Sequence, residues 1–157
     1  MTKIDLAKID DTMRPVLKKD GDNLRVFGVP QYYASPRGIA LAEYIGQFSV
    51  YESDKDTGQT IIKCDLTIDD IIEMVEDGTL PRKKINIIIR KVRGRERKTY
   101  RGWNQALPAL MELDISAAAS QNSNPIRNVS FHPMGWIPNK FGGHDKNKSN
   151  VLEIILW

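Results

Sequence analysis

Arginine and lysine side chains are concentrated in one short stretch of the chain. Ten of the 23 cationic residues fall within positions 82–101, where Glu96 is the only acidic residue. The ten are Arg82, Lys83, Lys84, Arg90, Lys91, Arg93, Arg95, Arg97, Lys98 and Arg101. Clustered cations attract phosphates and release the counterions that surround a nucleic acid. The stretch therefore predicts a phosphate-binding surface.

Aromatic residues extend this basic stretch, because Tyr100 and Trp103 stand among and beside its last cations. An aromatic ring beside a cation can stack on an exposed base, which contributes about 1 to 3 kcal/mol per base in single-strand binding proteins. We therefore expect a non-enzymatic protein without a cofactor that binds DNA or RNA. The expected contact residues are Arg90, Lys91, Arg93, Arg95, Arg97, Lys98, Tyr100, Arg101 and Trp103.

An acidic segment earlier in the chain supports a different hypothesis, a protein-binding module, an inhibitor or a self-associating assembly protein. Its acidic residues are Asp69, Asp70, Glu73, Glu76 and Asp77. This segment could pair with the basic stretch in the same molecule, in a second copy or in a partner. Lysine and arginine on an edge strand can also serve only to discourage aggregation between sheets.

A third hypothesis is a metal-dependent nuclease, built on the only two histidines of the chain. His132 and His144, followed by Asp145, could together hold a divalent metal beside a basic surface. Cys64 is a weaker candidate for chemistry, because alternation along the sequence places it on the same inward face as Ile62 and Leu66. A buried free cysteine behaves as a small apolar side chain.

The basic residues need a β-hairpin to bring them together. Residues 84–92 contain Ile85, Ile87, Ile88 and Ile89, a nearly continuous β-branched run that predicts a central strand buried on both faces. Residues 93–96 predict a turn and residues 97–103 the returning strand. Most of the basic side chains would then gather at the tip and along one edge of this hairpin.

The remaining elements are predicted from periodicity, caps and turn residues. Thr67 caps a helix whose apolar face is Ile68, Ile71, Ile72 and Val75, with Gly78 just past its end. Other helices are expected near residues 6–13, 35–47 and 106–113, and other strands near 15–19, 23–29, 48–50, 60–66, 126–132 and 151–157. Residues 116–124 and about eighteen residues between the last two strands are expected to be loops. The fold class predicted is α+β, an antiparallel sheet built from hairpins with about three short helices packed on it.

Composition places these elements in a single domain. The chain has 157 residues, of which 41% are hydrophobic and 27% charged, close to the averages of globular proteins. The net charge of +3 conceals nine cations against fifteen acids in residues 1–80, and fourteen against five in residues 81–157. The N-terminal residues lack the apolar core of a signal peptide, and Cys64 stands alone. We expect a cytoplasmic protein without a membrane partner.

Overall fold

The structure is a computed structural model that describes residues 13–20, 23–30, 35–53, 58, 60–120, 125–138, 141 and 144–157. Three helices and several small sheets make up these residues, so the α+β class predicted from the sequence is confirmed. The helix predicted near residues 6–13 lies outside the described residues, apart from Met13, which begins a strand.

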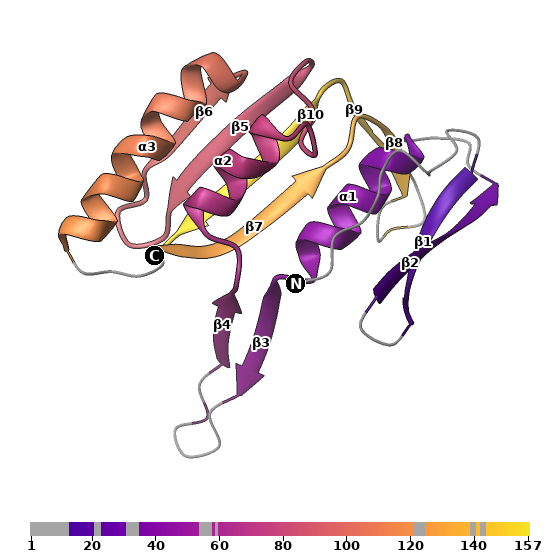
Figure 1. The fold of residues 1–157 in the computed structure, drawn as a ribbon, viewed down its shortest axis with the longest axis horizontal. Coiled ribbons are helices and arrows are strands. Elements are labelled where there is room, and N and C mark those ends of the chain that lie inside the picture. Colours follow the sequence, from indigo (N-terminus) through magenta and orange to yellow (C-terminus); the bar gives the residue numbers. More distant parts are fainter. Residues whose placement is uncertain are drawn as a thin grey trace.

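A four-stranded sheet forms the centre of the fold (Figure 1). Its strands lie in the order β6 (Arg97–Arg101), β5 (Ile85–Lys91), β10 (Asn150–Leu156) and β7 (Ile126–His132). The pairs β5–β6 and β10–β7 are antiparallel, whereas β10 runs parallel to β5. The sheet is therefore mixed, because β10 inserts between β5 and β7 instead of pairing through hairpins alone.

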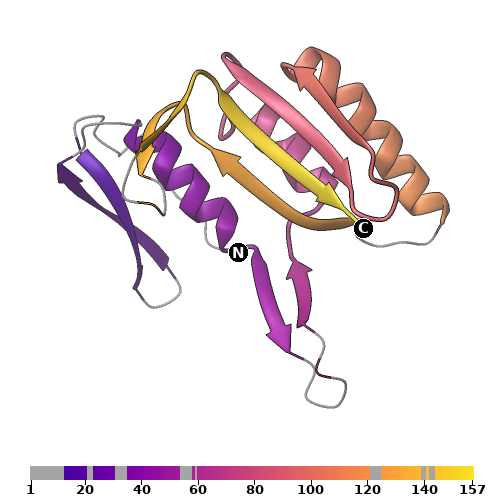
Figure 2. The same cartoon turned by 180° about the vertical axis from the view of Figure 1, so that it is seen from behind.

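The helices cover one face of this sheet (Figures 1 and 2). Helices α2 (Ile68–Glu76) and α3 (Trp103–Ala119) lie over the sheet, and α1 (Pro36–Gly46) packs against β7. The buried core combines Leu41 and Ile45 of α1, Ile71 of α2, Leu110 of α3 and the alternate residues of the strands. Those strand residues are Ile85, Ile87, Ile89, Val129, Phe131, Leu152 and Ile154. No described helix packs on the opposite face, which Figure 2 shows in front. At its β7 edge the Ser49 hydroxyl donates a hydrogen bond to the Asn128 side chain at 2.6 Å, and Ile155 is buried there.

Three two-stranded sheets complete the described fold. They are β1 (Met13–Asp20) with β2 (Asn23–Pro30), β3 (Ser49–Ser53) with β4 (Thr60–Cys64), and β8 (Gly135–Pro138) with β9 (His144–Asn147). The first two confirm the predicted hairpins. The third was not predicted, since the sequence between β7 and β10 indicated only a long loop.

The ends of α2 show why its boundaries were predictable. The Thr67 hydroxyl accepts a hydrogen bond from the Asp70 amide at 3.2 Å, and the Asp70 carboxylate accepts one from the Thr67 amide at 3.0 Å. This reciprocal capping box pairs two amides that a helix N-terminus otherwise leaves without partners. Gly78 follows the last turn with φ +82°, a conformation that glycine adopts without steric cost.

Two further predictions need correction. Strand β5 is buried on one face only, because Ile85, Ile87 and Ile89 are buried while Asn86 and Ile88 are partly exposed and Arg90 is exposed. The β-branched run concealed an ordinary alternation between a covered and an uncovered face. Helix α3 is also longer than predicted, because it begins at Trp103, which was expected to end the returning strand, and it takes in residues 116–119. Alanine, the strongest helix former, fills its last positions, and Ala117 packs in the core.

No helix within the described residues is long and apolar enough to cross a membrane.

Candidate functional site

The basic hairpin of β5 and β6 is divided by strand alternation into two faces. The register pairs Asn86 with Arg101, Ile88 with Thr99 and Arg90 with Arg97, and all six belong to the face that no described helix covers. We call this face, together with the matching residues of β10 and β7, the open face. Its exposed cations are Arg90, Arg97 and Arg101.

Two of these cations lie directly opposite one another. Arg90 of β5 and Arg97 of β6 are cross-strand partners, and like charges in such a position are destabilising. The Arg90 guanidinium reaches the Glu153 carboxylate of β10 at 3.6 Å, between side chains that are 47% and 24% exposed. Among the described residues, no ion pair involves Arg97. The two arginines therefore have one paired acid between them, Glu153, and together they keep an excess positive charge.

Lys91, Lys98 and Tyr100 lie on the other face of the hairpin, toward α3. Lys91 Nζ is 3.7 Å from Glu96 Oε2, and both residues border a cavity of about 260 Å³ that also contacts Glu112 and Ser116 of α3. Tyr100 is half-buried and packs against the core. These three predicted contact residues are therefore separated from the open face. The two lysines also share their cavity with the acids Glu96 and Glu112.

Arg93 and Arg95 occupy the exposed turn between the two strands. The Lys91 amide donates to the Glu96 carbonyl at 2.8 Å, which closes the turn. Arg95 has φ +54°, a left-handed conformation uncommon for a residue with a side chain. Both residues are exposed and follow the end of β5, and no described acid pairs with either.

Trp103 is part of the core. Only 5% of it is exposed, and its indole Nε1 donates to the Pro81 carbonyl at 2.8 Å. A buried ring bound in this way offers no free face for stacking on a base. Arg82 is likewise occupied, because its guanidinium donates to the carbonyls of Val75 and Glu76 at 3.2 and 3.3 Å. It thereby satisfies the C-terminal end of α2.

The acidic segment forms the outer side of α2. Asp69, Glu73, Glu76 and Asp77 are exposed, and Asp70 serves in the capping box. Asp77 also accepts a hydrogen bond from the Thr79 amide at 2.9 Å. The two ion pairs identified for hairpin cations use Glu153 and Glu96, neither of which belongs to this helix.

Arg101 also borders a hollow of about 230 Å³ between α2 and α3, together with Arg82 and Glu76. It therefore lies at the edge of the open face, within reach of both sides of the sheet. Arg90 and Arg97 are therefore the two cations that belong to the open face alone.

The metal-site candidates are only partly described. His132 is the exposed last residue of β7 and belongs to the open face, opposite Val151 in the register. His144 and Asp145 lie in β9, paired with Pro138 and Ile137, and their side chains are outside what the structure describes. Among the described residues, no group of three histidine, cysteine or acidic side chains could hold a metal. Cys64 packs against the core and donates to the Leu66 carbonyl at 3.8 Å.

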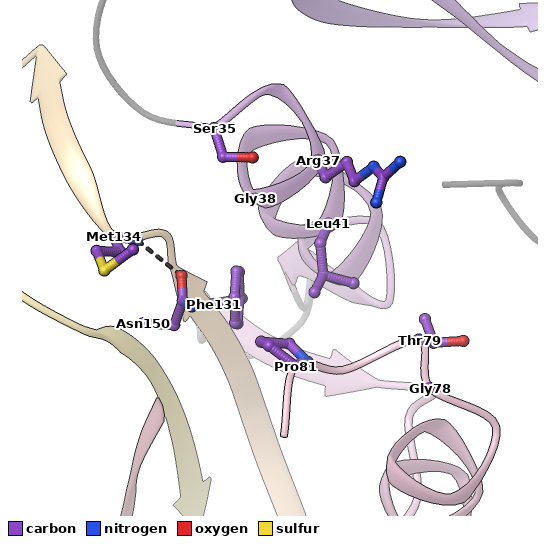
Figure 3. Close-up of a pocket in the computed structure, with 10 residues that line it drawn as sticks. All are labelled: Ser35, Arg37, Gly38, Leu41, Gly78, Thr79, Pro81, Phe131, Met134 and Asn150. Carbon is purple, nitrogen blue, oxygen red and sulfur yellow. Dashed lines mark hydrogen bonds between the residues drawn. The ribbon is translucent and has the colours of Figure 1, made fainter. Parts of the chain in front are cut away.

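A larger cavity lies apart from the hairpin, where the start of α1 meets the ends of α2 and β7 (Figure 3). Its volume is about 490 Å³, within the range of ligand pockets. Leu41, Pro81, Phe131 and Met134 provide apolar walls, and Asn150 accepts a hydrogen bond from the Met134 amide at 2.8 Å. Gly38 forms part of the wall. The cavity could hold a small apolar group, and it lies on the helix-covered side of Phe131.

Sequence reasoning identified the cations of the open face but missed how the hairpin divides them. The signal was the period of two along residues 97–101, which puts Arg97, Thr99 and Arg101 on one face and Lys98 and Tyr100 on the other. It also missed the residues that β10 and β7 add to the open face, because their pairing joins segments far apart in sequence. Those residues are Asn128, Ser130, His132, Val151, Glu153 and Ile155. Of these, Ile155 is buried and Asn128 is bound to the Ser49 hydroxyl of β3.

Comparison with protein-family models, with curated proteins and with solved structures gives no match to this chain. The fold and the site define it as an α+β domain in which one face of a mixed sheet carries paired arginines and no described covering layer.

Proposed function

We propose that this protein binds DNA or RNA, without catalysing a reaction, through the open face and the turn of the basic hairpin. The observation that carries the proposal is the pairing of Arg90 with Arg97 across β5 and β6. Two like charges held opposite each other favour an anionic ligand that neutralises both, and a phosphate diester is such a ligand. Arg93 and Arg95 in the turn would add contacts at the end of the same strands.

Arginine also suits this task by its chemistry. Its guanidinium is planar and presents five donors in a rigid fork that matches the oxygens of a phosphate. The proposal assigns phosphate contacts to Arg90, Arg93, Arg95, Arg97 and Arg101. Lys91 and Lys98 are left out because they face α3, and Trp103 is left out because it is buried. A cytoplasmic location is part of this proposal, in keeping with the single cysteine of the chain.

The test compares two neighbouring residues that lose the same charge on opposite faces. Binding of a fluorescein-labelled oligonucleotide is measured by fluorescence anisotropy at low salt for the wild type, Arg97→Gln and Lys98→Gln. We expect Arg97→Gln to weaken binding several-fold and Lys98→Gln to leave it within about twofold. Loss of affinity in both variants alike, or no binding by the wild type to any DNA or RNA, would reject the open face as the binding surface.

Self-association is the second candidate, favoured by the exposed acids Asp69, Glu73 and Glu76 on α2. It would bring α2 of one copy to the basic turn of the next. Light scattering after size exclusion, at high protein concentration and low salt, distinguishes the two functions. A monomer without nucleic acid excludes self-association. Assemblies that dissociate on Glu73→Lys, together with no oligonucleotide binding, would favour it over our proposal.

A further inference from the structure

We propose that the open face takes a single strand of nucleic acid and not a duplex, with phosphates along β5 and β6 and bases over β10 and β7. This inference rests on the proposed function, because it names the class of nucleic acid that the same surface accepts. It is carried by the shape of the surface and by the distribution of side chains across it.

The shape argues against reading a duplex through its major groove. The major groove admits an α-helix or a two-stranded ribbon and is about 12 Å wide. Strand β5 is not free to act as such a ribbon, because it pairs with β10 along its whole length, from Ile85 with Asn150 to Lys91 with Leu156. Four strands spaced about 4.8 Å apart span about 14 Å between the outer strand axes, before side chains are added. The Val92 amide still donates to the Leu156 carbonyl of β10, so within the hairpin only residues 93–96 extend past the paired strands.

The side chains divide the open face into two lanes. The lane on β5 and β6 carries Arg90, Arg97 and Arg101. Besides Glu153, the lane on β10 and β7 carries Val151, Ser130 and His132. Its end beside Arg90 is closed, because Ile155 is buried and the Asn128 side chain accepts a hydrogen bond from Ser49. Ile88 is partly exposed between the two lanes. An unpaired strand presents phosphates and base faces side by side, whereas a duplex presents mainly phosphates to a flat surface.

Glu153 strengthens the division between the lanes. Its carboxylate lies on β10 next to the arginine lane, where it pairs with Arg90. A carboxylate repels phosphates, so the backbone of a bound strand is directed toward β6. Two residues before Glu153 on β10, in the register row of Arg101, an unstacked base can lie against Val151. The exposed imidazole of His132, the cross-strand partner of Val151, is a ring on which a base can stack. The same carboxylate can accept a hydrogen bond from an exocyclic amine of a base.

The experiment compares a fluorescein-labelled 15-nucleotide deoxythymidine strand with a labelled 15-base-pair duplex of mixed sequence, at equal salt, with the full chain. We expect the single strand to bind at least tenfold more tightly. His132→Ser should weaken single-strand binding about three- to tenfold and leave duplex binding within twofold. Lys98→Gln is the matched control and should retain the full preference.

The results distinguish failure of this inference from failure of the proposed function. Equal or tighter binding of the duplex, or a His132→Ser variant with unchanged single-strand affinity, overturns the inference and leaves the proposed function intact. Binding of neither nucleic acid overturns the proposed function and the inference with it. Circular dichroism of each variant must match the wild type, and if His132→Ser does not fold, His132→Gln takes its place.

Discussion

Arg90 and Arg97 are direct cross-strand partners on the face of the sheet that no described helix covers. Within the part of the chain that the structure describes, the only acid paired with either is Glu153, which reaches Arg90 from the neighbouring strand at 3.6 Å. A sheet built only for stability would place an acid or a neutral residue opposite Arg90. The pairing of Arg90 with Arg97 should therefore lower the stability of the sheet and favour the binding of an anion. Both effects can be measured.

Replacement of Arg97 by threonine should stabilise the protein. Threonine suits an exposed strand position, and the change removes the repulsion while the pair between Arg90 and Glu153 remains. We expect the free energy of unfolding to rise by about 0.2 to 1 kcal/mol at low salt, the range of cross-strand pair energies. The measurement is urea denaturation at low and high salt, with Lys98→Thr as the control. A variant that is less stable than the wild type at low salt would refute the repulsion.

Trp103 should be important for stability and unimportant for binding. Trp103→Phe removes the indole donor to the Pro81 carbonyl and leaves that partly buried carbonyl without its partner. The expected loss is about 1 to 3 kcal/mol in the free energy of unfolding. Oligonucleotide affinity of the folded variant should not change. If affinity fell while the unfolding free energy stayed constant, the ring would be part of the binding surface after all.

The contact between Gly38 of α1 and Pro133 should exclude any side chain at position 38. A Cβ at Gly38 would lie 2.7 Å from the Cβ of Pro133, within the wall of the cavity in Figure 3. We expect Gly38→Ala to lower the free energy of unfolding by about 1 to 3 kcal/mol, as overpacking does, despite the helix preference of alanine. Gly46→Ala in the same helix is the control, since a Cβ there would meet nothing within 4 Å apart from its chain neighbours and the backbone of its own helix. Equal effects of the two substitutions would contradict the close contact.

Tyr44 should make stability depend on pH in the alkaline range. Burial raises the pKa of the Tyr44 phenol above its usual value of 10.0, and the charges of Asp70 and Asp77 raise it further. Because the unfolded chain then loses this proton first, the contribution of Tyr44 is complete below pH 10 and decreases as the pH rises toward the higher folded pKa. Tyr44→Phe should lack that part of the decrease. Urea denaturation of both proteins between pH 8 and 11 measures the difference, and parallel curves would exclude it.

Local features of the fold were predictable because their causes are local. The capping box at Thr67 and the glycine at position 78 fix α2 within a few residues of sequence. The basic stretch at positions 82–101 was visible for the same reason. What stayed hidden depends on pairing between distant segments: the insertion of β10 beside β5, the uncovered face, and the approach of Glu153 to Arg90. Trp103 was misassigned because its neighbours in sequence are cations while its neighbours in space are Pro81 and the core.

The salt dependence of binding tests the central claim most directly. The observed association constant for a single-stranded oligonucleotide is measured from about 50 to 300 mM salt for the wild type. The same series is run on a variant in which Arg90, Arg93, Arg95 and Arg97 are all changed to glutamine. The slope of log K against log salt is about −0.7 per phosphate neutralised on a single strand. We predict that the variant loses about 2 to 3 units of slope, and an unchanged slope would contradict phosphate binding by these arginines.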